Sequence, residues 1–268
     1  DLGHVEREVG RGLRDLHLYR RAEQVFSGDP SLVEAYRARQ DRLIRLQRLY
    51  RQRLRQLVSA AIDLYALQGE PALLTPERRH AISQLRSLDA HHVARVRAIH
   101  AEFEADFDPV INPLLARHVA EISSILDGCA GLLITGGNVA VLLNRMRLFG
   151  IGSRLDSIPV VGWSAGAMVL TERIVLFHDK LPRRRRDAEI LSPGFGLLPG
   201  WVFLPDAAHR LDHDDVLALD VMARRFQPAR CVLLDNGVHM VCDGQQPLAG
   251  QALRSIERGG RIGALPRL

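Results

Sequence analysis

Apolar and polar residues change their spacing near residue 128, and this change divides the sequence into two regions. Before residue 128, apolar residues recur every three, four or seven positions, which is the spacing of amphipathic helices. After it, short apolar runs alternate with helical stretches, which is typical of an α/β fold. We therefore expect a helical region followed by an α/β region.

The clearest predicted helix runs from about Pro30 to Gln68. Asp29 can cap its first turn, proline suits its first position, and Gly69 ends it. Because so long a helix is unusual in a globular protein, we expect a helical hairpin or an oligomer contact. Two further helices are predicted, from Thr75 to about Phe107 with a break near residues 87–89, and from Pro113 to Leu126.

The second region carries five apolar runs that we interpret as buried strands: Leu132–Thr135, Pro159–Trp163, Trp201–Leu204, Cys231–Asp235 and Val238–Cys242. Predicted helices lie between them at Val139–Leu148, Ala165–Arg173 and Asp214–Arg225. This alternation predicts an α/β fold with a largely parallel sheet flanked by helices. Upstream, Leu13–Tyr19 suits either a strand or the start of a helix, and its partial alternation favours the strand.

Composition excludes several classes of protein. The chain has 35 Arg and one Lys, Lys180, and a net charge of +5. Because the basic excess is mild and concentrated in residues 1–55, we expect no nucleic-acid partner. No apolar run approaches the roughly 18 residues that a membrane helix needs, so no membrane partner is expected. Three cysteines without a CxxC pair indicate a reducing compartment, and we expect a cytoplasmic protein.

The strongest chemical signal is Gly-Trp-Ser-Ala-Gly at residues 162–166, which joins an apolar strand to a helical stretch. Small residues around Ser164 permit the tight strand-to-helix turn that exposes a nucleophilic hydroxyl. The backbone N–H groups at the start of the following helix could then stabilise an oxyanion. Thirty residues earlier, Gly136-Gly137-Asn138 follows another strand and could supply a second N–H donor.

A serine nucleophile needs a base and an orienting acid. His209 and Asp235 follow two predicted strands, so Ser164, His209 and Asp235 could meet at the carboxyl edge of the sheet. An ordinary α/β-hydrolase order would pair Asp235 with His239, but these residues lie about 13 Å apart along one strand. Asp179 is a competing acid that we rank below Asp235, because it leads into a polar loop.

These residues carry a resemblance to a known family. The GWSAGA motif, the GGN turn upstream and GFGLLPG before the histidine resemble the dipeptidase E and cyanophycinase family of serine peptidases, over about residues 119–245. The resemblance implies a class I glutamine amidotransferase-like sandwich. It also implies that Ser164 is the nucleophile, that His209 and Asp235 complete the triad, and that the N–H groups of Gly137 and Ala165 form the oxyanion hole.

The chain also departs from this family pattern. Asp235 stands where the family usually has Glu, and Arg210 follows the histidine in place of Phe. The family's first strands are not evident. We therefore expect residues 1–28 to be a partial N-terminal segment of the α/β domain, 29–112 a helical insertion and 113–268 the serine-hydrolase-like domain.

The sequence thus predicts a serine peptidase-like hydrolase that cleaves a short peptide or isopeptide-like bond, with an aspartyl substrate implied by the resemblance. Asn138 and Arg210 are expected to contact substrate, and no metal or organic cofactor is expected. The alternative is a catalytically inactive relative that serves in assembly, and we expect a homo-oligomer formed through the helical region. An esterase that uses His239 is a further alternative.

Three other features favour structural explanations. His209 and His213 have helical metal-ligand spacing, but the acidic residues between and after them suit an exposed helix start better. His91, His92 and His100 are expected on the surface of the helical region. Arg183–Arg186 is expected to be an exposed loop, which would contact an acidic substrate group if it overhung the site.

Overall fold

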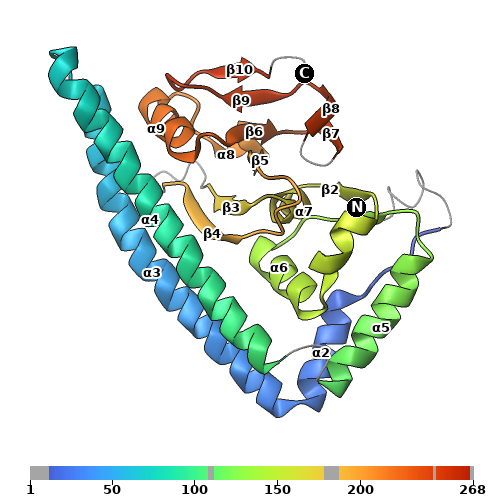
Figure 1. Cartoon of the computed structure of the whole chain (residues 1–268). Helices are drawn as coiled ribbons and strands as arrows, with labels where there is room; N and C mark the ends of the chain where they lie inside the picture. Colours follow the sequence, from blue (N-terminus) through green and yellow to red (C-terminus); the bar gives the residue numbers. More distant parts are fainter. Residues whose placement is uncertain (1–11, 108–111, 178–186, 244–245, 266–268) are drawn as a thin grey trace.

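The computed structural model describes residues 12–107, 112–177, 187–243 and 246–265 (Figure 1). Its helices are α2 (Leu18–Gly28), α3 (Pro30–Ala66), α4 (Pro71–Asp106), α5 (Pro113–Asp127), α6 (Val139–Leu148), α7 (Ala165–Leu170), α8 (Ala207–Arg210) and α9 (Val216–Phe226), with a 3-10 helix at Ile151–Ser157. Its strands are β1 (Leu132–Ile134), β2 (Val160–Gly162), β3 (Arg173–Leu176), β4 (Glu189–Pro193), β5 (Trp201–Pro205), β6 (Arg230–Leu234), β7 (His239–Asp243), β8 (Gln246–Gln251), β9 (Arg254–Ile256) and β10 (Ile262–Ala264).

Helices α3 and α4 form a long antiparallel hairpin beside the α/β region, with its tip projecting past it (Figure 1). The predicted start of α3 is confirmed, because Asp29 Oδ1 accepts a hydrogen bond of 3.0 Å from the Leu32 N–H. Helix α4 begins at Pro71, earlier than predicted, and continues through residues 87–89. The predicted break there is wrong, because Leu85, Leu88 and His92 are buried along one continuous helical face.

The strand that we favoured at Leu13–Tyr19 is also wrong. Helix α2 begins at Leu18, and residues 13–17 have no regular secondary structure. Ala22 and Val25 are fully buried three positions apart, which is helical spacing. The short sequence is compatible with a strand or a helix, and packing of this apolar face favours the helix.

The strands form small mixed sheets in place of the single, largely parallel sheet that the sequence predicts. Strands β1 and β2 pair in parallel, and so do β5 and β6. Strands β9 and β10 extend the second pair by antiparallel pairing, and β3–β4 and β7–β8 are antiparallel two-stranded sheets. Short connections such as those from β7 to β8 and from β9 to β10 allow only antiparallel neighbours. The protein is therefore an α/β protein with a mixed strand arrangement.

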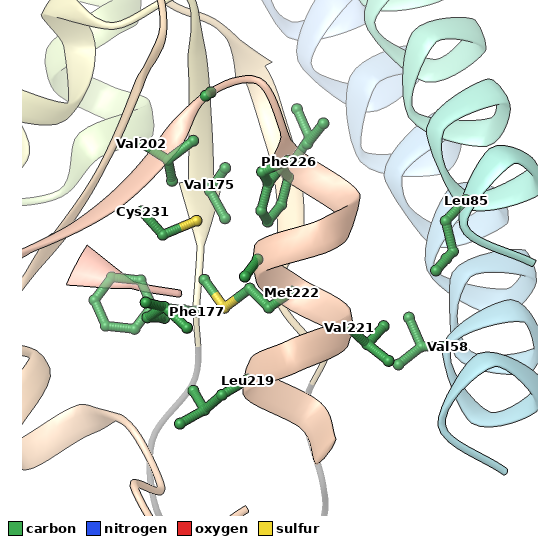
Figure 2. Packing of buried hydrophobic residues seen from close by; sticks show 14 of the residues in the cluster. Val58, Leu85, Val175, Phe177, Val202, Leu219, Val221, Met222, Phe226 and Cys231 are labelled. Atoms are coloured by element: carbon green, nitrogen blue, oxygen red, sulfur yellow. The ribbon is translucent and has the colours of Figure 1, made fainter. Parts of the chain in front are cut away.

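The hairpin packs against the α/β region through a shared hydrophobic core. Val58 of α3 and Leu85 of α4 belong to the same buried cluster as Val221 and Phe226 of α9. Figure 2 shows Val221 facing Val58 across the boundary between α9 and the hairpin. The two regions therefore share one continuous core.

A buried ion pair crosses the same boundary. The Arg225 guanidinium on α9 donates two hydrogen bonds of 2.7 Å to Asp89 on α4, and a third of 2.7 Å to the Tyr50 hydroxyl on α3. Burial lowers the pKa of Arg225, but Tyr50 and Asp89 outweigh that effect and the pKa is raised. Tyr50 also donates to Asp89 and accepts from the Ile190 N–H, so β4 joins the same network. The network fixes the hairpin relative to α9 and β4.

Among the residues placed by the structure, no helix is both long and apolar enough to cross a membrane.

Candidate active site

Ser164 occupies the turn between β2 and α7, where its backbone adopts φ 53° and ψ −123°. This conformation is strained for any residue other than glycine and costs on the order of 1–3 kcal/mol. The Ser164 side chain is exposed at the start of α7. A strained turn that presents a hydroxyl to solvent is the arrangement that a nucleophilic serine requires.

Both glycines of the Gly-x-Ser-x-Gly motif are required by close backbone contacts. A Cβ on Gly166 would lie 2.0 Å from the Ile134 carbonyl oxygen at the end of β1. A Cβ on Gly162 would lie 2.8 Å from the Gly166 carbonyl oxygen. The motif is therefore the sequence that lets the turn close against β1, which confirms the tight strand-to-helix turn predicted there.

The glycine turn after β1 lies directly beside this serine. A Cβ on Gly136 would lie 3.2 Å from the Ser164 Oγ and 3.9 Å from the Ala165 nitrogen. Gly137 has φ 123°, a conformation that side chains rarely adopt, and the space around its α-carbon is open. The structure thus brings the Gly136–Gly137 turn to Ser164 and Ala165, while the oxyanion hole itself stays a prediction.

His209 lies on the four-residue helix α8, and its contact with an acid differs from the predicted one. Its Nδ1 lies 2.6 Å from Asp206 Oδ1. Asp206 follows β5 directly and has a left-handed φ of 56°. Sequence reasoning missed Asp206, although aspartate is among the few side chains that tolerate this conformation and it stands three residues before His209.

Asp235 makes different contacts. Its Oδ1 accepts a hydrogen bond of 2.8 Å from the Ala208 N–H, and its Oδ2 accepts one of 3.1 Å from Arg254. Since Asp235 follows β6 and α8 follows the neighbouring β5, the ends of these strands do meet. In the described contacts, Asp235 accepts a hydrogen bond from the backbone of α8, while Asp206 contacts the imidazole of His209.

The Ser164 hydroxyl has no hydrogen-bond partner within the described part of the chain. Ser164, Gly136 and Ala165 form one group, and His209, Asp206 and Asp235 form another. No hydrogen bond joins the two groups through the serine in the described residues. The triad of Ser164, His209 and Asp235 therefore stays a prediction.

The model of peptidase family S51 matches residues 83–248, which is more than half of the chain. The chain belongs to peptidase family S51. Comparisons with curated proteins and with solved structures each gave no match. Membership of family S51 supports a serine peptidase-like hydrolase, and the matched segment contains Ser164, His209 and Asp235. The match begins inside α4, so the later part of the hairpin belongs to the S51 segment.

In this S51 protein, the two residues predicted to contact substrate have structural partners. Asn138 Oδ1 caps α6 by accepting hydrogen bonds of 3.1 Å from the N–H groups of Ala140 and Val141. Arg210 donates to the Phe177 carbonyl at 3.0 Å, and its guanidinium lies 4.3 Å from the centroid of the Phe177 ring. Arg210 therefore ties α8 to the end of β3, and contact of either residue with substrate stays a prediction.

The remaining sequence candidates near the hydrolase site are His213 with its acidic neighbours, Asp179 and Arg183–Arg186. No group of three or more His, Cys, Asp or Glu side chains that could hold a metal ion lies within the described ranges. His213 Nε2 lies 3.3 Å from the Ala207 carbonyl, and Asp215 caps α9 through the Ala218 N–H. Asp179 and Arg183–Arg186 lie outside the described residues.

Proposed function

We propose that this protein is a serine hydrolase of family S51 that cleaves a short peptide or isopeptide-like bond through an acyl-enzyme. The observation that carries the proposal is Ser164, whose strained and exposed position is retained at the junction of β2 and α7. Strain of this kind persists where the surrounding structure enforces it, and it is concentrated at functional sites. An aspartyl substrate, the cytoplasmic location and the class I glutamine amidotransferase-like sandwich are parts of this proposal.

In the proposed reaction, the Ser164 Oγ attacks the substrate carbonyl while His209 Nε2 takes its proton. The N–H groups of Gly137 and Ala165 stabilise the oxyanion of the tetrahedral intermediate. His209 then gives the proton to the leaving amine, and a water molecule hydrolyses the acyl-enzyme by the same route in reverse. Because catalytic hydrogen bonds are often formed only with substrate bound, we propose that the exposed side chain of His209 reaches Ser164 when substrate binds, while α8 itself stays anchored.

We assign the orienting acid to Asp206 and a structural role to Asp235. The Asp206 contact of 2.6 Å with Nδ1 would leave Nε2 facing the substrate, as a general base requires. Asp235 would keep α8 in place through the Ala208 N–H.

Labelling with a fluorophosphonate probe tests the nucleophile. The wild-type protein should be labelled and Ser164→Ala should not, because the probe reacts with an activated serine hydroxyl. Ser153→Ala is the matched control, since Ser153 is exposed and bonds only to the Gly150 carbonyl among the described residues. Labelling that survives in Ser164→Ala would overturn the assignment.

A comparison of two isosteric variants tests the acid. Asp206→Asn should lower kcat/KM by roughly 10²–10⁴-fold, because the amide favours the wrong imidazole tautomer. Asp235→Asn keeps an acceptor for the Ala208 N–H and should lower kcat/KM by less than about tenfold. The opposite order of effects would identify Asp235 as the acid.

The second candidate is an inactive relative that serves in assembly and oligomerises through the helical hairpin. The Ser164 hydroxyl, which has no hydrogen-bond partner among the described residues, favours it, and so do Leu67 and Leu73, which are 51% and 68% exposed near the hairpin tip. Wild-type protein that resists the probe and forms a dimer by light scattering would support this candidate. A labelled monomer would exclude it.

A further inference from the structure

A cavity of about 360 Å³ lies between the hairpin and the α/β region. Its walls come from α3, α4, α6 and β4, which meet on the inner side of the hairpin (Figure 1). Leu43, Val96, Leu143 and Leu191 supply apolar surface. The volume lies within the range of small-molecule sites. None of the residues assigned above to the hydrolase site lines it.

Buried polar groups without partners line this cavity. His100 and Ser192 are 3% and 4% exposed. The Nδ1 of His100, the Oγ of Ser192 and the Nε2 of Gln40 have no hydrogen-bond partner in the described chain. His100 was expected on the surface, and that expectation is wrong because α4 turns it toward α3 and α6. Since unpaired buried polar groups are rare and costly, their convergence on one cavity points to a ligand.

The charge around the cavity is positive. Arg48 and Arg51 are the charged residues of its described wall, which contains no Asp or Glu. Arg51 is neutralised by two hydrogen bonds of 2.7 Å to Glu189. Arg48 is exposed and has no acidic partner in the part of the chain that the structure describes. A ligand with a negative charge would supply the missing partner.

Two further arginines stand behind the cavity, next to His100. Burial first, and then the charges of Arg147 and Arg39, lower the pKa of His100 to about 3. The ring is therefore neutral at pH 7 and can donate a hydrogen bond without adding another buried charge. The nearby carboxylate, Glu104, lies 3.5 Å from Arg147, while two nitrogens of the buried Arg39 have no hydrogen-bond partner among the described residues.

We propose that this cavity binds a small organic carboxylate with a short apolar body. Arg48 and His100 would donate hydrogen bonds to the carboxylate, and Ser192 and Gln40 would complete its polar contacts. The leucines of the cavity wall would cover the apolar body. The site is separate from Ser164 and does not depend on hydrolase activity.

Calorimetric titration of the full chain with hexanoate tests this proposal. Hexanoate should bind with one site per chain, and the neutral isostere hexanamide should bind at least roughly tenfold more weakly, because it forfeits the charge-assisted hydrogen bonds. Binding should be the same in Ser164→Ala, which separates this cavity from the hydrolase site. Absence of hexanoate binding at millimolar concentration, or equal binding of hexanamide, would overturn the proposal.

Two arginine variants on one helix locate the bound carboxylate. Arg48→Gln should weaken hexanoate binding by roughly tenfold. Arg45→Gln is the matched control, because Arg45 is an exposed arginine of α3 outside the cavity wall. Ser192→Ala removes one buried hydroxyl and should also weaken binding. Equal affinities in all three variants and the wild type would refute the assignment of the cavity.

Discussion

The backbone of Ser164 has a conformation that glycine adopts without cost and serine does not. Gly162 and Gly166 permit this turn, because their α-carbons lie too close to neighbouring carbonyl groups for any side chain to fit. The chain therefore keeps a strained serine where an unstrained glycine would stabilise the fold. This is the pattern expected when a hydroxyl is retained for its chemistry.

Two substitutions of Ser164 separate strain from function. Ser164→Gly should be more stable than Ser164→Ala by about 1 kcal/mol, because only glycine relieves the positive φ. Both variants should lose fluorophosphonate labelling. The free energy of unfolding from urea denaturation checks the difference, and equal stabilities would contradict a strained turn.

At the residue scale, the sequence predicts Ser164 better than the partners of His209. The strand, the two glycines and the helix that define the Ser164 turn lie within a few residues of one another, so local pattern suffices. The pairing of His209 with Asp206 depends on the left-handed turn after β5. This turn lies beside the end of β6, where the Leu234 carbonyl accepts a hydrogen bond from the Asp206 N–H and Asp235 accepts one from the Ala208 N–H. Local spacing could not choose between the two acids.

At the scale of elements, the hairpin is positioned by a few contacts deep in its interface with α9 and β4. Arg225 is 3% exposed, and the side chain of its partner Asp89 is equally inaccessible. Removing one member of such a pair leaves an uncompensated buried charge. The network is therefore sensitive to substitution even though surface ion pairs are not.

Arg225→Met should lower the free energy of unfolding by about 3–5 kcal/mol, because it leaves the buried Asp89 carboxylate without its cationic partner. Arg42→Met is the matched control, since Arg42 and Glu102 form an ion pair between α3 and α4 with more than half of each side chain exposed. It should leave the urea midpoint unchanged. Similar losses in both variants would show that burial of the Arg225 pair contributes little.

Elements with strong local patterns were predicted closely, and those that depend on distant pairing were not. Helix α6 has the predicted bounds, and α3 ends two residues before its predicted end. Residues 171–173, assigned to a helix, instead lead into β3, which pairs antiparallel with β4. Strand β4 was missed because it begins with Glu189, whose burial depends on Arg51 of the distant helix α3. A charged residue of this kind does not suggest a buried strand until its partner is known.

At the scale of the whole molecule, hairpin and α/β region should unfold together. Both tryptophans, Trp163 and Trp201, lie in the α/β region, so their fluorescence reports on that part alone. Far-ultraviolet circular dichroism reports mainly on the long helices. One cooperative unit gives coincident transitions by the two methods.

Leu85→Ala in α4 should destabilise both transitions by about 2–5 kcal/mol, because Leu85 is fully buried in the core shared with α9. Leu73→Ala on the same helix should change neither, since Leu73 is 68% exposed. If Leu85→Ala shifts the dichroism but not the tryptophan fluorescence, the hairpin unfolds by itself.

Acidification should destabilise the protein before its carboxylates titrate. Burial lowers the pKa of His92 to about 4 and of His100 to about 3, from an ordinary value of 6.5. Between pH 6.5 and about 4 the unfolded chain therefore binds protons that the folded chain does not, and stability falls as the pH falls.

His92→Phe, which keeps a ring stacked on Tyr50, should flatten this dependence of the unfolding free energy on pH. His91→Phe, at an exposed neighbouring position, should leave it unchanged, and identical slopes in the two variants would contradict the assignment.

The two partners of the ion pair between α4 and α9 are synthesised at different times. The ribosome completes α4 at Asp106 and α9 only at Phe226, 120 residues later. At typical synthesis rates this delay lasts about 6–24 s. During that interval the part of the hairpin that packs against α9 lacks this cover, and Asp89 lies within it. A buried carboxylate disfavours packing against any surface without a matching guanidinium, so we expect Asp89 to disfavour wrong partners of the nascent hairpin until Arg225 is synthesised.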